Sequence, residues 1–358
     1  MTSTAPLADM IVAGVDTHRD THHIAVIDQV GRPLADAQFP ATTDGYRQLL
    51  VWMSGHGIAQ RIGIEGTGSY GAGLARFLAG AGVTVVEVDR PDRRTRRARG
   101  KSDPIDAYAA AAAALNGTAS GTPKSRVGLV EAVRSLRVAR RGAMKARTQT
   151  INQLRALIVT APADLREQLR GLTPARLVVA CSRLRPARNS DLADCPGQDV
   201  VMAAAKSALR RLARRYQYLS QEIGDLDDEL RPLVRAAAPA LLELRGVATE
   251  VAGQLLACVG DNPERLRSEA SFAHLCGVAP IPASSGRTDR HRLNRGGDRS
   301  ANNALHTIVL SRLRYDPRTR DYAARRTGQG LGKKEIMRCL KRYVAREVFR
   351  ALPTLDSP

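Results

Sequence analysis

The sequence predicts a mixed α/β N-terminal domain, a long helical middle region and a mainly α-helical C-terminal domain. Short apolar runs alternate with amphipathic segments before residue 100. Two long charged segments with helical periodicity follow, and the last part has apolar residues at helical spacing. With 358 residues, 43% of them hydrophobic, the chain can form two or three domains with cores of their own. We place the domain boundaries at 9–120, 121–236 and 237–352.

The N-terminal elements follow from apolar runs and the turn residues between them. Three strands are expected in MIVAGVDTH, HHIAVIDQVG and PLADAQFPA, and a helix in DGYRQLLVWMSGHG. A strand in RIGIEGTGSYG, ending near Glu65, precedes a helix in GAGLARFLAGAG and a strand in VTVVEVD. This order of elements is typical of a mixed α/β domain.

The middle of the chain is dominated by two long helical patterns, from about residue 127 to 159 and from about 200 to 233. They predict an antiparallel hairpin or coiled coil, although a plain helical bundle fits equally well. The segment LLELRGVATEVAGQLLACVGD then resembles a helix-hairpin-helix, which presents backbone N–H groups to phosphate. The last segment, KKEIMRCLKRYVAREVFRAL, predicts an amphipathic helix with Lys and Arg on its polar side.

Composition limits the classes of partner and location. A formal net charge of +20 favours a polyanionic partner, most simply nucleic acid. Aromatic residues make up only 4%, so base stacking is not expected to dominate binding. Five scattered cysteines without a CxxC pair argue against structural zinc and suit a reducing compartment. The sequence has no signal-peptide pattern and no apolar run long enough to span a membrane, so we expect a cytoplasmic protein without membrane contact.

Four acidic residues are candidates for a metal site. In KSDPIDA, Asp103 is expected to cap a helix, with Pro104 at its first position and Asp106 at its third. Helix capping and dipole complementarity are the simple explanation for this pair. Asp16, however, ends the first predicted strand, and Glu65 ends a later one.

These positions would converge in an RNase H-like fold, where carboxylates hold Mg²⁺ or Mn²⁺. Two such ions can stabilise the attacking and leaving oxygens of a phosphodiester substitution. Basic residues beside the acids would hold the nucleic-acid backbone. They are Arg93, Arg94, Arg96, Arg97, Arg99 and Lys101. We do not expect His18, His22 and His23 to bind zinc, because an H-x-x-x-H spacing between strands does not place two rings on one side.

The stretches GVDTHRDTHHIAVID, IEGTGSYG and KSDPIDA resemble the DEDD transposases of the IS110 insertion-sequence family. The resemblance continues in FAHLCGVAPIPASSGRTDRHRLNRGGDRSANNALHTIVL and covers nearly the whole chain. It implies a RuvC-like (RNase H-like) N-terminal domain whose catalytic and metal-binding acids are Asp16, Glu65, Asp103 and Asp106. It also implies a C-terminal transposase domain with a catalytic serine before a Ser-Gly step, here Ser285, with Ser284 as second choice.

The stretch after the serine is rich in side chains that can bind phosphate or base edges. They are Arg287, Arg290, Arg292, Asn294, Arg295 and Arg299. The family has a Ser-Lys-Arg-Gly-like step here, whereas this chain has Leu293-Asn294-Arg295-Gly296. Any specific role of that lysine is therefore in doubt for this chain, although Arg295 keeps a positive charge.

The resemblance further implies a recombinase directed by a structured bridge RNA that pairs with donor and target DNA. Members are expected to work as homodimers or homotetramers, with the long helices as a contact. The predicted function is therefore a Mg²⁺-dependent transposase that cleaves and rejoins DNA by serine attack. Two alternatives stay open: a RuvC-like hydrolytic nuclease of the junction-resolvase type, and a non-catalytic nucleic-acid-binding protein.

Overall fold

A computed structural model describes residues 10–88, 102–185, 197–285 and 291–353. The chain folds into two compact units, and each is described by itself. The sheet unit contains Met1–Gly128 and Val259–Ser271, and the helical unit contains Leu129–Cys258 and Phe272–Pro353. No helix in the described ranges is both long and apolar enough to cross a membrane. The four cysteines that the structure describes are free.

The sheet unit is built on one five-stranded mixed sheet in the order β3-β2-β1-β4-β5. Strands β1, β2 and β3 are antiparallel neighbours, whereas β1, β4 and β5 run parallel. Its elements are β1 Met10–Thr17, β2 Thr21–Ile27, β3 Pro33–Pro40, α1 Thr43–Ser54, β4 Ile58–Glu65, α2 Ala72–Gly80, β5 Val85–Val88 and α4 Asp103–Leu115. Because β1 and β4 run in the same direction, their carboxyl ends meet at one edge of the sheet.

Two separate cores cover the two faces of this sheet. One face packs Ile11, Ala13 and Val15 of β1 with residues of α1 and α2 such as Leu49 and Leu74. The other face packs the apolar residues of α4 on β1 and β5. The alternation of side chains along a strand makes this division, since residues two apart point to the same face.

Helix α4 lies very close to the sheet because the strands beneath it carry glycine. A Cβ atom on Gly14 would lie 2.1 Å from the backbone nitrogen of Ala111, and one on Gly63 would lie 2.6 Å from the carbonyl oxygen of Ala110. Alanines at 110, 111 and 114 complete this contact and are buried. The alanine-rich run therefore serves close packing of a helix on a sheet.

The segment Val259–Ser271 joins the sheet unit through hydrogen bonds to the chain that follows α4. Asn262 Nδ2 donates to the carbonyl oxygen of Pro123 at 2.9 Å, and its Oδ1 accepts from the backbone nitrogen of Ser125 at 3.0 Å. Arg265 Nε donates to the carbonyl oxygen of Thr122 at 2.9 Å. This unit therefore contains residues far apart in sequence.

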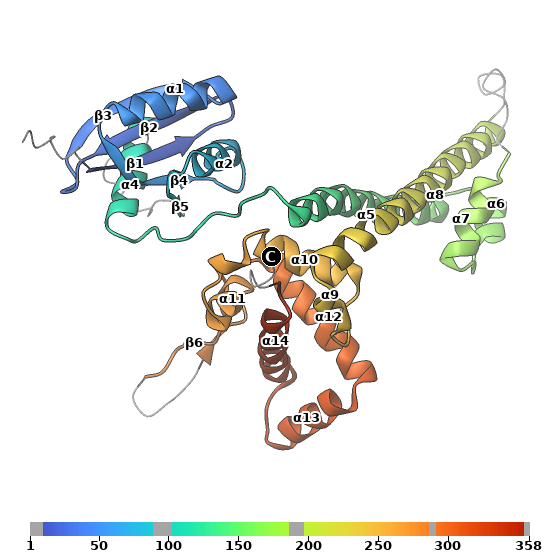
Figure 1. Ribbon diagram of the computed structural model, residues 1–358. Helices are drawn as coiled ribbons and strands as arrows, with labels where there is room; N and C mark the ends of the chain where they lie inside the picture. Colours follow the sequence, from blue (N-terminus) through green and yellow to red (C-terminus); the bar gives the residue numbers. More distant parts are fainter. Residues whose placement is uncertain (1–9, 89–101, 186–196, 286–290, 354–358) are drawn as a thin grey trace, which may run out of the picture. The chain divides into compact units, whose positions relative to one another are not determined.

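The helical unit contains a pair of long helices that lie side by side, as Figure 1 shows. Bidentate hydrogen bonds from Arg140 of α5 to Asp227 of α8, at 2.6 and 3.1 Å, join them in one part of their length. Elsewhere Leu154 of α5 and Leu209 of α8 share an apolar core with two short helices. These helices are α5 Leu129–Val159, α6 Ala163–Leu169, α7 Pro174–Ser182 and α8 Gln198–Ala237.

The C-terminal part of the chain is helical, with one small hairpin. Its helices are α9 Pro239–Glu243, α10 Thr249–Val259, a 3₁₀ turn η2 Pro263–Arg265, α11 Glu269–Leu275, α12 Arg299–Tyr315, α13 Pro317–Gly328 and α14 Lys333–Arg350. Strands β6, Ile281–Pro282, and β7, His291–Arg292, pair in antiparallel fashion. Buried Arg312 of α12 donates to the carbonyl oxygen of Arg245 and to Glu347 of α14, at 2.8 and 2.7 Å.

The predicted mixed α/β N-terminal region and the mostly helical remainder are confirmed, and element limits differ by a few residues. One local prediction was wrong: Ser102, not Asp103, is the N-cap of α4, and Asp103 is its first residue. The Asp106 nitrogen donates to the carbonyl oxygen of Ser102, which starts the helix one residue earlier. Pro104 tolerates this shift because the first turn needs no backbone donor there.

Candidate metal centre and nucleic-acid surface

The predicted acids are placed by one face of the sheet and the helix above it. Gly14 and Gly63 both face α4, and they are register partners in β1 and β4. Asp16 and Glu65 lie two residues further along the same strands, so they belong to the same face. The first turn of α4 carries Asp103 and Asp106 toward this edge. The hydroxyl of Thr17 donates to the carbonyl oxygen of Glu65 at 2.9 Å and ties the two strand ends together.

Three side chains at this edge form a possible metal-ligand group: Asp16, His18 and Asp103. His18 Nε2 lies 3.2 Å from Asp16 Oδ2 and 3.2 Å from Asp103 Oδ1. The imidazole thus stands between two carboxylates. In the sequence, His18 stands out only as part of an H-x-x-x-H zinc pattern, which does not place it with the acids. Its position two residues after Asp16, in the turn before β2, is the signal that could have found it.

The electrostatics of Asp16 show that the carboxylates interact. Burial raises the pKa of Asp16 above its ordinary value, His18 opposes this rise, and Asp106 and Asp103 add to it. Asp16 is 7% exposed and Asp106 only 3%, so water screens this repulsion poorly. The structure therefore brings Asp16, Asp103 and Asp106 together, and it places Glu65 on the same face at the end of the neighbouring strand.

The predicted serines lie in the segment that connects β6 and β7. Ser284 and Ser285 lie two and three residues after the end of β6, and both are exposed. Among the predicted nucleic-acid residues after them, Arg292, Arg295 and Arg299 are exposed. Asn294 is half-buried, and its side-chain oxygen accepts from the backbone nitrogen of Gly296 at 2.9 Å. Arg287 and Arg290 lie outside the described residues, as do all of Arg93, Arg94, Arg96, Arg97, Arg99 and Lys101.

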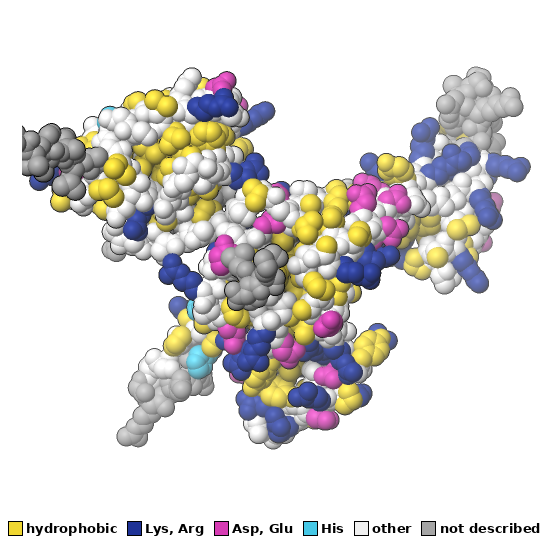
Figure 2. Space-filling view, in the orientation of Figure 1, with side chains coloured by type: hydrophobic (Ala, Val, Ile, Leu, Met, Phe, Trp, Pro, Cys, Tyr) yellow, Lys and Arg dark blue, Asp and Glu magenta, His cyan; other side chains and the backbone are white. Residues whose placement is uncertain are grey.

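The helical unit carries basic surface beyond the residues that were predicted to bind nucleic acid. Figure 2 shows Lys and Arg side chains gathered over α13 and α14. A groove of about 970 Å³ lies between α14 and the chain around β7. Five cations and one carboxylate line it: Arg292, Arg338, Lys341, Arg342, Arg346 and Glu335.

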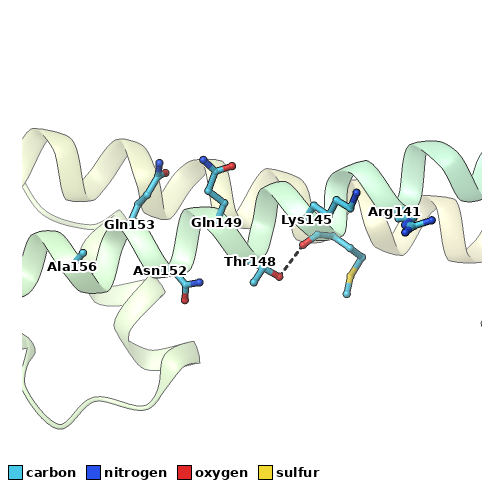
Figure 3. Close-up of a pocket in the computed structure, with 8 residues that line it drawn as sticks. Arg141, Lys145, Thr148, Gln149, Asn152, Gln153 and Ala156 are labelled. Carbon is cyan, nitrogen blue, oxygen red and sulfur yellow. Dashed lines mark hydrogen bonds between the residues drawn. The ribbon is translucent and has the colours of Figure 1, made fainter. Parts of the chain in front are cut away.

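A second, shallower groove of about 790 Å³ runs along α5. Figure 3 shows that its side chains come from successive turns of this one helix. Arg141 and Lys145 supply positive charge, and the amides of Gln149, Asn152 and Gln153 continue the stripe. The hydroxyl of Thr148 donates a hydrogen bond to the carbonyl oxygen of Met144 at 2.9 Å. The stripe is polar, and nothing in its pattern specifies one ligand.

An α/β sheet with carboxylates gathered at the start of a helix, joined to a basic helical unit, fits the class of metal-dependent proteins that handle nucleic acid. Comparison with known proteins identifies the family. A DEDD transposase model of the IS110 type matches residues 13–161. A model described as transposase of the IS116/IS110/IS902 family matches residues 238–324. The chain belongs to the IS110 family of transposases.

A curated relative supports this assignment. The chain is similar to the insertion element IS900 uncharacterized 42 kDa protein of Mycobacterium paratuberculosis, with 29% identity over 191 residues. The match covers 49% of this chain and 47% of the relative. The chain thus matches about half the length of that protein.

Proposed function

We propose that this protein is the transposase of an insertion sequence, and that it cleaves and rejoins DNA strands by Mg²⁺-assisted serine attack under the guidance of a bridge RNA. The observation that carries the proposal is the convergence of Asp16, Asp103 and Asp106, with Glu65 on the same face, at the N-terminus of α4. This arrangement, together with the strand order β3-β2-β1-β4-β5, supports an RNase H-like domain of the RuvC type. The paired long helices support a coiled-coil arm.

The acidic residues fit a divalent ion. Asp16 Oδ2 is buried, and apart from its ion-pair contact with His18 it has no hydrogen-bond partner among the described residues, so it is an oxygen that a cation would satisfy. Oxygen ligands of this kind suit Mg²⁺ or Mn²⁺. The metal would be held by Asp16, Glu65, Asp103 and Asp106. His18, which lies between Asp16 and Asp103, would either become a further ligand or move aside when the ion binds. When bound, the ion supplies Lewis-acid polarisation of the scissile phosphate.

Ser285 is the proposed nucleophile, and Ser284 is the alternative. Its Oγ forms a bond to phosphorus while the bond from phosphorus to the 3′ oxygen breaks. The serine proton leaves to solvent, and the departing 3′ oxygen takes up a proton to become a 3′ hydroxyl. The resulting 5′-phosphoserine ester conserves the energy of the phosphodiester bond. Attack by a 3′ hydroxyl of another strand then reverses the chemistry and frees the serine.

The net charge of +20 supports binding of both DNA and RNA. Donor and target DNA would be selected by base pairing with a bridge RNA, while the protein binds the nucleic-acid backbone. The active assembly is a homodimer or homotetramer. The acidic cluster and Ser285 then act on one phosphate either from one subunit or from two.

The proposal is tested by expressing the protein with the DNA that flanks its gene and sequencing the RNA that stays bound in high salt. One discrete RNA encoded by a flank is expected. A smear of cellular RNA would remove the guide from the proposal.

The same flanking DNA, with that RNA, then serves as substrate for cleavage. The wild type should form a covalent protein–DNA adduct that depends on Mg²⁺, and Ser285→Ala should lose both adduct and cleavage. Ser284→Ala is the matched control and should keep both. Cleavage that survives both serine substitutions would instead assign hydrolysis by water, and cleavage absent in the wild type would leave a binding protein.

Mixing two inactive variants, Asp106→Ala and Ser285→Ala, tests the assembly. Restored activity in the mixture means that the acids of one subunit work with the serine of another. An inactive mixture means that both come from the same subunit.

A further inference from the structure

The groove beside α14 contains a buried cation without a carboxylate partner. Lys341 is 9% exposed, and its Nζ donates to the side-chain oxygen of Asn302 at 2.8 Å. No ion pair within the described part of the chain joins Lys341 to an acid. Burial lowers the pKa of this ammonium group, and Arg338 lowers it further. A buried ammonium group normally has a counterion, because removing it from water is costly.

Asn302 cannot neutralise that charge, and it is itself held in place. Its Nδ2 donates to the carbonyl oxygens of Cys276 and Gly277, at 2.8 and 3.1 Å. This fixes its oxygen as a hydrogen-bond acceptor for Lys341. The lysine is therefore held in one position at the wall of the groove and has N–H donors to spare.

The other charged residues that line the groove also favour an anionic ligand. Its lining cations outnumber its one carboxylate, Glu335. Glu335 already accepts from the backbone nitrogen of Gly332 at 2.9 Å, and its other oxygen lies 3.8 Å from Arg338. The lining of the groove thus carries more cations than carboxylates, which favours an anionic ligand.

The walls also offer apolar surface next to the cations. Leu293 and Tyr343 line the groove and are 50% and 49% exposed. A basic groove with an aromatic ring on its wall suits a nucleotide strand, whose phosphates meet cations while a base lies on the ring. An isolated inorganic anion would leave this apolar surface unused.

Position along the chain relates the groove to the proposed nucleophile. Pro280, before β6, and His291 and Arg292 of β7 line the groove, and Ser285 is three residues beyond the end of β6. Ser285 is five residues after Pro280, and five residues at about 3.3 Å each span at most about 17 Å. One strand of duplex DNA carries a phosphate per about 3.4 Å of axis, so the groove lies within a few nucleotides of the attacked phosphate.

We propose that the groove between α14 and β7 holds the single DNA strand next to the phosphate that Ser285 attacks, and that Lys341 binds one phosphate of this strand. The proposal rests on the proposed function for the identity of the strand as DNA. Lys341 is a positioning residue, because the phosphate that it binds is not the phosphate that reacts.

The first experiment measures binding of a fluorescein-labelled 20-nucleotide single-stranded DNA to the full chain across a range of NaCl concentrations. Lys341→Met keeps an unbranched side chain that is one atom shorter, and it removes the charge. We expect weaker binding and a slope of log affinity against log salt that is smaller by about 0.7, the value for one phosphate contact in a single strand. The melting temperature should be unchanged or higher, because an uncompensated buried charge has been removed.

Arg231→Met is the matched control. It removes one positive charge from α8, where Arg231 is exposed and paired with Asp228 at 3.1 Å. Its salt slope should equal that of the wild type. Equal losses in both variants would overturn the proposal, since only the net charge would then matter. The same measurement with a 20-nucleotide RNA distinguishes the source: a loss confined to RNA would also overturn it.

A second experiment locates the strand independently of any charge change. DNA with 5-iodouracil should photo-cross-link to the peptide containing Tyr343, and cross-links only to peptides outside the groove would refute the assignment. Loss of strand binding in Lys341→Met, with no serine adduct in the wild type, would support the groove and reject the serine chemistry. Adduct formation at the wild-type rate in Lys341→Met would reject the groove alone.

Discussion

The close approach of α4 to the sheet predicts that one added methyl group disrupts the candidate metal centre. In Gly14→Ala the new Cβ would lie 2.1 Å from the Ala111 nitrogen and 2.3 Å from the Ala107 carbonyl oxygen. Both are backbone atoms of α4, so no side-chain rotation relieves the clash. Opening 2.1 Å to the 3.4 Å of an ordinary contact requires a shift of about 1.3 Å between helix and strand.

That shift has two consequences of different size. Overpacking of this kind costs about 1–3 kcal/mol of stability. It also moves Asp103 and Asp106, which belong to α4, away from Asp16, which belongs to β1. A displacement of about 1 Å at a reacting centre costs roughly 100-fold in rate. We therefore expect a folded protein with a lower melting temperature, a roughly 10- to 100-fold loss of metal affinity and almost no cleavage.

The assay is Mn²⁺ binding followed by electron paramagnetic resonance, which needs no DNA substrate, together with thermal unfolding. Gly80→Ala is the control in the same unit, because a Cβ atom added there would have no atom within 4 Å. It should bind Mn²⁺ as the wild type does and be equally or slightly more stable. Gly63→Ala should behave like Gly14→Ala, since its Cβ would lie 2.6 Å from the Ala110 carbonyl oxygen. A Gly14→Ala protein with wild-type Mn²⁺ affinity and melting temperature would refute the reasoning.

Three further predictions concern single side chains. Because burial raises the pKa of Asp16, its ionised form destabilises the metal-free fold above that pKa. Asp16→Asn should therefore raise the melting temperature without metal and abolish stabilisation by Mg²⁺, and a lower metal-free melting temperature would contradict this. Asp316 caps α13 and accepts from the Thr319 hydroxyl and nitrogen at 2.6 and 3.1 Å, and the hydroxyl is the main cause of its lowered pKa. Asp316→Ala should cost about 1 kcal/mol in urea unfolding at neutral pH. The difference from wild type should disappear as the pH falls below about 4 through the depressed pKa, and a pH-independent difference would show that the carboxylate charge is not involved. Arg312→Met should cost about 2 kcal/mol, because it removes two hydrogen bonds from a buried guanidinium, whereas exposed Arg318→Met should change stability by less than about 0.5 kcal/mol.

Local patterns in the sequence were sufficient to predict the elements of this protein. Short apolar runs located β1, β2 and β4, and the paired helical patterns located α5 and α8 to within a few residues. Each of these signals depends on residues close together in the chain, so it survives without knowledge of the fold. The acids at 16, 65, 103 and 106 were predicted as candidates because each lies near the end of a strand or the start of a helix.

Which of these residues meet depends on contacts between distant parts of the chain. Parallel pairing of β1 with β4 aligns Asp16 with Glu65, and the glycine–alanine contact brings α4 down on the same face. His18 is close to Asp16 in sequence, but it meets Asp103 only because α4 packs on the sheet.

Lys341 illustrates the same division between local and distant information. In the sequence it is one more charge on the polar side of an amphipathic helix. Packing against α12 buries it beside Asn302, thirty-nine residues away in the chain. Elements and charges could be predicted from the sequence because they are local properties. A buried charge without a counterion could be identified only in the folded chain, because burial depends on residues that are distant in sequence.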